Sequence, residues 1–324
     1  MLGPVIEQSE RQMRANAGGG FVPWQQPELA PVPISLPSAS SSTTSRISPN
    51  RKSRPVPFPN LSLRHISAAS SPLTSIDKNA RKFLAQLQSH PLLSQSAREL
   101  KILSNLVDQL ERDQPNPTND CVEVFNRLIC NSPVDKSFAL LALFRLAVSV
   151  RSVAKSFLDS EFESIFGLHR FCSEDCPTSV VLMALCSLSN LLSYGTDSYH
   201  LAIDPRTTEY MLGPLRSQQP LTRMMAAIVI YNCSLHLHFE PTDAEDHDDI
   251  GVQLISAVNE AVGVENNAAA KYRMLLALGH LVYFMGNEGI LLLAALEFDA
   301  SLFTEPANAA EVAADIQILL SNPI

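Results

Sequence analysis

The chain has 324 residues, of which 46% are hydrophobic and only 6% aromatic, and its formal charge is −9. Packed helices use such a Leu-, Ala- and Ser-rich mixture and β-sandwiches do not, so the composition favours an all-α fold. The charge is uneven, because residues 1–76 carry seven Lys/Arg against three Asp/Glu, about +4, which leaves about −13 for the remainder. An acidic body argues against a nucleic-acid partner, since it has no excess of cations to displace counterions from a phosphate backbone.

Six cysteines are spread through the chain without the density or spacing of a small secreted disulfide framework, which indicates free intracellular thiols. The N-terminal residues contain early acids and no seven-residue apolar run, so they resemble neither a secretory signal nor a transit peptide. The apolar stretch at 289–296 is far shorter than the roughly 20 residues that a membrane span requires. We therefore expect a soluble protein, cytoplasmic and/or nuclear, with no membrane partner.

Residues 1–74 are rich in Pro, Ser and Thr, and we expect a disordered leader there, followed by one helical domain at 75–324. A segment of this composition buries too little apolar surface to offset the entropy lost on ordering. Its proline clusters at 31–33 and 55–59 are either ligands for an aromatic groove or simple linker. The basic run at 51–54 is either a nuclear-import or phosphorylation-tuned patch or an ordinary solvated run.

From residue 75 the chain changes to long amphipathic stretches separated by caps and breakers. These residues place helix starts near 75–77, 94–96, 116–118, 133–135, 177–178 and 220–222. The first two helices are expected to reach about residues 88 and 113. Outer helices are predicted at about 157–171, 197–215 and 250–262, and capping helices at 299–302 and 309–320.

Four nearly all-apolar stretches recur along this domain, beginning at Leu140, Leu182, Arg223 and Arg273. The step from Leu140 to Leu182 has the same length as the step from Asn190 to Asn232. The step from Arg223 to Arg273 is longer, because a polar insert at 236–249 extends it. The spacing falls within the period of about 40 to 47 residues that is typical of armadillo and HEAT repeats. The sequence thus predicts an all-α, armadillo/HEAT-like helical solenoid whose apolar helices are the inner, buried ones.

Four sequence blocks stand in order at this spacing. They are FALLALFRLA at 138–147, LSNLL at 188–192, TRMMAAIVIYNCSL at 222–235 and KYRMLLALG at 271–279. Together they resemble the PUL domain, a family found at the C-terminus of the phospholipase-activating protein and its fungal counterparts. The last block is similar to the family's Tyr-Arg-Leu-Leu-Val-Ala-Leu-Gly signature. The resemblance covers about residues 117–302 and implies an armadillo-like array.

The resemblance also implies a non-catalytic adaptor. Its basic concave groove would receive the acidic, Tyr-containing C-terminal tail of the valosin-containing AAA+ ATPase of the ubiquitin–proteasome pathway. The groove arginines of the family map by motif position onto Arg145 and Arg273, and Arg223 takes a place where the family often has Lys. Lys271 and Tyr272 adjoin Arg273 in the same block and join the predicted partner-binding residues. We recognise no WD-repeat propeller, ubiquitin-binding module, thiol peptidase or thioredoxin-like domain, so direct ubiquitin recognition does not carry over.

The arginines at 145 and 273 occupy apolar runs, where a guanidinium must meet a carboxylate, line a wet groove or incur a large desolvation cost. The planar fork of Arg suits a carboxylate tail because it binds bidentately. The alternative is an internal ion pair to an outer-helix acid such as Glu123 or Glu161.

Asn190 and Asn232 recur at equivalent positions of two inner helices. Such residues either grip the backbone of an extended ligand or make hydrogen bonds between helices. Tyr272 likewise either contacts the ligand or packs at a helix start.

The group His169, Cys172 and Cys176 lacks a second ligand pair at the spacing of a structural zinc site, so we predict free thiols and no metal. The insert at 236–249 is expected to be a solvated acidic loop rather than a cation site. The sequence has no nucleophile elbow, phosphate-cradling loop or His-Glu-x-x-His motif, so we predict neither an enzyme nor a cofactor.

Two other functions remain open at this point. One is a generic helical-repeat scaffold that assembles several proteins through its outer face and the Pro-rich leader. The other is a remnant of a thiol isopeptidase fusion, although cysteines in apolar helices or acidic turns disfavour a thiolate.

Overall fold

The computed structural model describes residues 79–112, 117–159, 167–173, 175–239 and 246–321. These residues form helices joined by turns, without a strand. The helices are α2 (Ala80–Leu87), α3 (Ala97–Glu111), α4 (Asn119–Asn131), α5 (Phe138–Ala147), α6 (Arg151–Leu158), α8 (Thr178–Leu192), α9 (Tyr199–Ala202), α10 (Pro205–Leu215), α11 (Pro220–Phe239), α12 (Asp246–Val264), α13 (Ala268–Met285), α14 (Asn287–Ala295) and α15 (Ala307–Ser321). Short 3-10 helices occur at η3 (Val134–Lys136), η4 (Leu168–Phe171), η5 (Gly195–Ser198) and η6 (Ala300–Leu302). The prediction of an all-α fold is confirmed.

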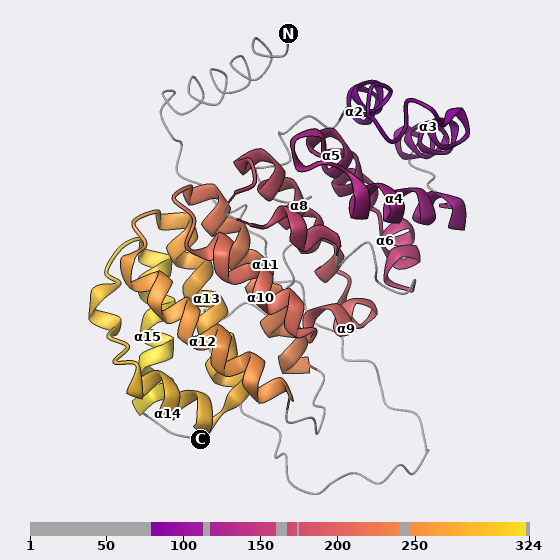
Figure 1. Ribbon diagram of the computed structural model, residues 1–324. Helices are drawn as coiled ribbons and strands as arrows, with labels where there is room; N and C mark the ends of the chain where they lie inside the picture. The colour runs from indigo at the N-terminus through magenta and orange to yellow at the C-terminus, as the bar shows by residue number, and fades with distance from the viewer. Residues whose placement is uncertain (1–78, 113–116, 160–166, 174, 240–245, 322–324) are drawn as a thin grey trace, which may run out of the picture. The chain divides into compact units, whose positions relative to one another are not determined.

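The helices α2, α5, α8, α11, α13 and α15 form an inner row in which each packs against the next (Figure 1). A second layer includes α4, α10, α12 and α14, which pack on α5, α11, α13 and α13 respectively. Contacts between sequential repeats are the defining feature of a solenoid, because each unit buries its apolar face only by stacking on its neighbours. The predicted helical solenoid is therefore confirmed for the described residues.

The middle helices of the inner row, α5, α8, α11 and α13, are apolar over most of their length because neighbouring helices cover them. In α8, thirteen of the fifteen residues are buried, including Ser187, Ser189 and Asn190. The predicted inner helices beginning near 140, 182, 223 and 273 correspond to α5, α8, α11 and α13. Among the helices of the described ranges, none is both long and apolar enough to cross a membrane.

Several predicted boundaries were wrong. The outer helix expected at 197–215 is divided into η5, α9 and α10, because Asp204 and Pro205 begin a new helix there. The Asp204 carboxylate accepts a hydrogen bond from the Arg206 N–H at 2.9 Å, and Pro205 lacks an N–H that would need a partner. The expected helix at 157–171 is represented by the end of α6 and by η4, and residues 160–166 between them lie outside the described part.

The insert was also misplaced, since α11 continues to Phe239 and α12 begins at Asp246. The sequence interpretation missed α14 altogether. The predicted start at 75–77 and the leader at 1–74 lie outside the described residues.

A tight turn sets α14 against α13. Gly286 has φ 62° and ψ −131°, in the region that favours glycine. At Gly289, an added Cβ would lie 3.1 Å from both the Cα and the carbonyl oxygen of Val282. The two glycines therefore allow the second-layer helix to approach the backbone of the inner one.

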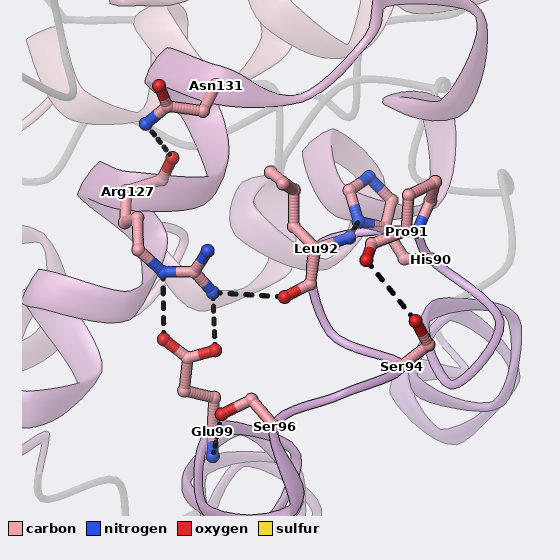
Figure 2. A network of polar contacts seen from close by, with 8 residues as sticks. All are labelled: His90, Pro91, Leu92, Ser94, Ser96, Glu99, Arg127 and Asn131. Atoms are coloured by element: carbon pink, nitrogen blue, oxygen red, sulfur yellow. Dashed lines mark hydrogen bonds and ion pairs between the residues drawn. The ribbon is translucent and has the colours of Figure 1, made fainter.

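The first helices are joined by a polar network around Arg127 of α4 (Figure 2). Its Nε donates to Glu99 Oε1 of α3 at 2.8 Å, and its Nη2 donates to the other carboxylate oxygen and, at 3.4 Å, to the Leu92 carbonyl oxygen. The Ser96 hydroxyl caps α3 by accepting from the Glu99 N–H. One guanidinium thus holds α3, α4 and the preceding turn together.

Candidate partner-binding site

Four of the predicted residues lie where two neighbouring inner helices begin, and we name this group the α11/α13 edge: Arg223, Lys271, Tyr272 and Arg273. Arg223 is in the first turn of α11, and the other three are in the first two turns of α13. The two helices pack against each other. The apolar core blocks that follow these residues fix both helices and thereby position the four side chains.

A chain of hydrogen bonds ties Arg223 to the start of α13. Its Nη2 donates to Glu265 Oε1 at 2.7 Å, and its Nη1 donates to the Ser217 carbonyl oxygen at 2.7 Å. The same Glu265 oxygen accepts from the Asn267 N–H at 2.7 Å. Asn267 in turn caps α13, because its Oδ1 accepts from the N–H groups of Ala269 and Ala270 at 3.1 and 3.0 Å. Residues 271–273 therefore follow from a start that is held in place.

Arg223 and Glu265 neutralise each other. The Glu265 side chain is 0% exposed and that of Arg223 is 20% exposed. Burial alone would raise the pKa of Glu265, but hydrogen bonds from Arg223 and from the backbone N–H groups of Asn266 and Asn267 hold that pKa below its usual range. The bond to Glu265 raises the pKa of Arg223. The net charge of the edge consequently comes from Lys271 and Arg273.

Arg273 and Tyr272 are both half-buried, and the Arg273 guanidinium lies over the Tyr272 ring at 5.3 Å from its centroid. Burial lowers the pKa of Arg273, and burial raises that of Tyr272. Cations near a helix N-terminus oppose the macrodipole, whose positive end lies there. Helix stability thus gives no reason for Lys271 and Arg273 at this position, whereas an anionic ligand would be attracted by both the side chains and the helix start.

Arg145 lies near the end of α5 and is only 3% exposed. Burial lowers its pKa, and burial also raises the pKa of the nearby Cys186 thiol to about 12. Neighbouring side chains cover this guanidinium, so a ligand reaches it only if they move. Glu161, one of the two acids considered as its ion-pair partner, lies outside the described residues, and Glu123 is exposed on α4. The ligand role of Arg145 stays a prediction.

The two asparagines join successive inner helices. Asn190 Nδ2 donates to the Arg145 carbonyl oxygen at 3.1 Å, and Asn232 Nδ2 donates to the Ser189 carbonyl oxygen at 3.3 Å. Both residues are almost completely buried, at 1% and 0% exposure. These bonds favour the interhelical alternative for both amide groups, and a ligand role for them stays an untested prediction.

A second pair of side chains also forms hydrogen bonds between successive inner helices, and the sequence interpretation missed this pair. The Tyr194 hydroxyl donates to the Val148 carbonyl oxygen at 3.1 Å, and His236 Nε2 lies 2.9 Å from the Leu192 carbonyl oxygen. Each side chain forms a hydrogen bond to a carbonyl oxygen at the end of the preceding inner helix, where no intrahelical partner is available. Tyr194 and His236 are separated by one full repeat, as the two asparagines are, so the repeat period could have revealed them.

These bonds show that α5, α8 and α11 run parallel, because they join equivalent ends of the helices. The seven predicted residues therefore divide into two groups. Arg223 and Asn232 on α11 are nine residues apart, which corresponds to about 13 Å along a helix. The α11/α13 edge lies at the helix starts, while Arg145, Asn190 and Asn232 lie toward the other end.

The remaining motif, at 169–176, is held by contacts within the protein. His169 stacks on Tyr210 at 4.1 Å between ring centroids, and Cys176 Sγ donates to the Arg170 carbonyl oxygen at 3.3 Å. Among the described residues, no three His, Cys, Asp or Glu side chains are grouped to hold a metal ion. Burial raises the pKa of Cys172 to about 12, as it does for Cys121 and Cys233, which disfavours a thiolate at these positions.

The family comparison bears directly on these blocks. The model of the PUL domain matches residues 64–311, about three quarters of the chain. The chain belongs to the PUL domain family. The match contains the four sequence blocks, the α11/α13 edge and the inner row through α13. Comparison with curated proteins gave no match. Membership in this family, together with the stacked helices, indicates a protein-interaction module.

Proposed function

We propose that this PUL domain is a non-catalytic adaptor that binds the acidic, Tyr-containing C-terminal tail of the valosin-containing AAA+ ATPase, in the ubiquitin–proteasome pathway of the cytoplasm or nucleus. The observation that carries the proposal is the placement of Lys271 and Arg273 at the start of α13. Lys271 stands in the first turn, against the helix macrodipole, and Arg273 follows in the second turn with its guanidinium over the half-buried Tyr272.

The charge balance of the edge supports an anionic partner. The Arg223–Glu265 pair has no net charge, and its function is to fix the turn before α13. Lys271 and Arg273 are the other two cations of the edge. Charge-assisted hydrogen bonds contribute roughly 1.5 to 3 kcal/mol each, so two or three of them sustain micromolar binding.

A peptide titration tests the proposal. A fluorescent peptide of the ATPase tail is added to the full chain, and its anisotropy is expected to report a micromolar dissociation constant. Arg273→Glu is expected to raise that constant at least about tenfold, since it replaces an attraction by a repulsion. Raising the salt concentration from about 0.05 to about 0.5 M is expected to weaken binding, because ions screen exposed charges.

The matched control is Arg98→Glu, which makes the same charge change at an exposed position of α3, a helix that packs at the other end of the row. It is expected to change the dissociation constant less than about twofold, because screening limits attraction at a distance. Thermal melting followed by circular dichroism checks that both variants fold. Equal losses in the two variants would mean that the peptide responds only to total charge, and the site assignment would fail.

Arg145 requires a gentler change, because a buried carboxylate there would be expected to unfold the domain. Arg145→Met keeps an extended side chain without the charge. A folded Arg145→Met protein with unchanged tail affinity would remove Arg145 from the binding site and leave the α11/α13 edge as the contact.

A further inference from the structure

Within the described residues α15 is the final helix of the inner row, and its surface turned toward the preceding 3-10 helix is hollow. The hollow has a volume of about 480 Å³. We name it the α15 groove, and its lining combines the small or apolar Ala300, Phe303, Ala310, Ala314 and Ile318 with the polar Ser301, Thr304, Gln317 and Ser321. Two large apolar side chains are exposed on or beside it, Ile318 at 48% and Leu302 at 67%.

The shape of this groove suits a helix. Ala310, Ala314, Gln317 and Ile318 follow one another at intervals of four, three and one residues, which places them on one face of α15. Small side chains on such a stripe let another helix approach closely. At the earlier steps of the row, each inner helix is covered by the next one.

The charge around the groove specifies the partner further. Residues 274–324 contain no Lys or Arg and six acids: Glu288, Glu297, Asp299, Glu305, Glu311 and Asp315. Glu297, Asp299, Glu305 and Glu311 are exposed. A second copy of the chain would bring these acids against one another, whereas Lys and Arg flanking an apolar helix face would be attracted.

We propose that the α15 groove binds a basic amphipathic helix of a partner protein, which takes the place of a further inner helix beyond α15. Apolar side chains of that helix cover Ile318, Phe303 and the alanines, and its Lys or Arg side chains face the acids around the groove. Four lining residues, Ala314, Gln317, Ile318 and Ser321, lie beyond residue 311, where the match to the PUL domain ends. The other five lining residues lie within the match, so the groove extends past the matched segment, and it shares no lining residue with the α11/α13 edge.

The test uses the full chain and two synthetic 18-residue helical peptides. Both carry Leu at positions i, i+3, i+4 and i+7 of each two turns, and they differ only in having Lys or Glu at the remaining positions. The Lys peptide is expected to bind with a micromolar dissociation constant measured by fluorescence anisotropy. The Glu peptide is expected to bind at least about tenfold more weakly, because the acids around the groove repel it.

Two matched pairs of variants locate the binding. Ile318→Lys in the groove is expected to weaken the Lys peptide at least tenfold, whereas Val252→Lys, at a 40% exposed apolar residue of α12, is expected to have less than a twofold effect. Glu311→Lys is expected to weaken binding of the Lys peptide about threefold or more. The control Glu123→Lys makes the same change at an exposed position of α4.

Three results would overturn the proposal. Equal effects within each pair would show attraction to the net charge of −9 alone. Sedimentation showing a dimer that Ile318→Lys dissociates would assign the groove to a second copy. Tighter peptide binding after Arg51, Lys52 and Arg54 are replaced by Gln, measured at about 0.5 M salt so that ions screen the change in net charge, would identify the chain's own basic segment as the occupant. A change in tail-peptide affinity is not expected from Ile318→Lys, so failure here leaves the proposed tail binding intact.

Discussion

The α11/α13 edge and the α15 groove present opposite chemistry on the same row of helices. The edge has polar, half-buried cations whose positions are fixed by a buried ion pair and a helix cap. The groove has an apolar lining and exposed acids, with no Lys or Arg after Arg273. The difference shows that one solenoid can bind partners of opposite charge at separate surfaces, because different residues of the repeat form each surface. Helix starts provide the first surface, and the exposed side of α15 provides the second.

The largest expected effect concerns the ion pair beneath the edge. Arg223→Met removes the guanidinium and leaves Glu265 buried without its charged partner, which is expected to destabilise the fold by about 3 kcal/mol. Urea unfolding measures this change. Arg216→Met removes an arginine from an ion pair with Glu260 in which both side chains are more than half exposed. That control is expected to change stability by no more than about 0.5 kcal/mol.

If Arg223→Met changed the free energy of unfolding as little as Arg216→Met, the ion pair would not hold the edge in place. The contrast between an edge fixed by a buried ion pair and a groove bordered by exposed acids would then be lost.

A charge reversal at the edge tests whether the α11/α13 edge and the α15 groove bind their peptides independently. The double variant Lys271→Glu/Arg273→Glu is expected to weaken the acidic tail peptide by about 100-fold, since two favourable contacts become repulsive. The Lys peptide of the α15 groove is expected to keep its affinity within about twofold. Both constants come from anisotropy titrations on the same protein preparation. A parallel loss of the two peptides would point to a general change in fold or charge and would contradict two independent surfaces.

The periodic features of the fold could be predicted from the sequence, because stacking requires the same apolar block at each step. The one-repeat spacing between Asn190 and Asn232 also marks residues that occupy equivalent positions. The sequence alone did not decide what those positions do, because an amide group serves a neighbouring carbonyl as well as a ligand. Arg223 and Glu265 are separated by the same one-repeat spacing, but their pairing depends on where α12 ends.

The groove at α15 was not predictable in the same way. It lies on an exposed side of α15, and a pattern of apolar residues looks the same whether or not something covers it.

Asn190→Ala distinguishes structure from ligand contact at the asparagines. The substitution leaves the buried Arg145 carbonyl oxygen without the Asn190 amide, and we expect a loss of about 1 to 2 kcal/mol in urea unfolding. Tail affinity is expected to stay within about twofold, since the α11/α13 edge is unchanged. The matched variant Asn232→Ala is expected to behave alike, because its amide donates to Ser189. A tenfold weaker tail complex with little loss of stability would instead support a ligand role for these residues.

The smallest expected effect is a pH dependence that belongs to the edge and not to the groove. The folded protein holds the pKa of Glu265 below its usual value, so the unfolded chain binds the proton more readily. The stabilising contribution of Glu265 is therefore fully present above the ordinary glutamate pKa, and it is lost as the pH falls through the lower, folded value. Stability measured by urea unfolding between about pH 6 and pH 3 should reveal this loss, although other carboxylates add to the total slope.

Glu265→Gln is expected to be less stable near neutral pH and to show a shallower decline toward acid, whereas Glu311→Gln, at an exposed position beside the groove, should follow the unmodified protein. Identical slopes for all three proteins would mean that the buried carboxylate does not couple proton binding to folding, and the edge would then owe its geometry to the Asn267 cap alone.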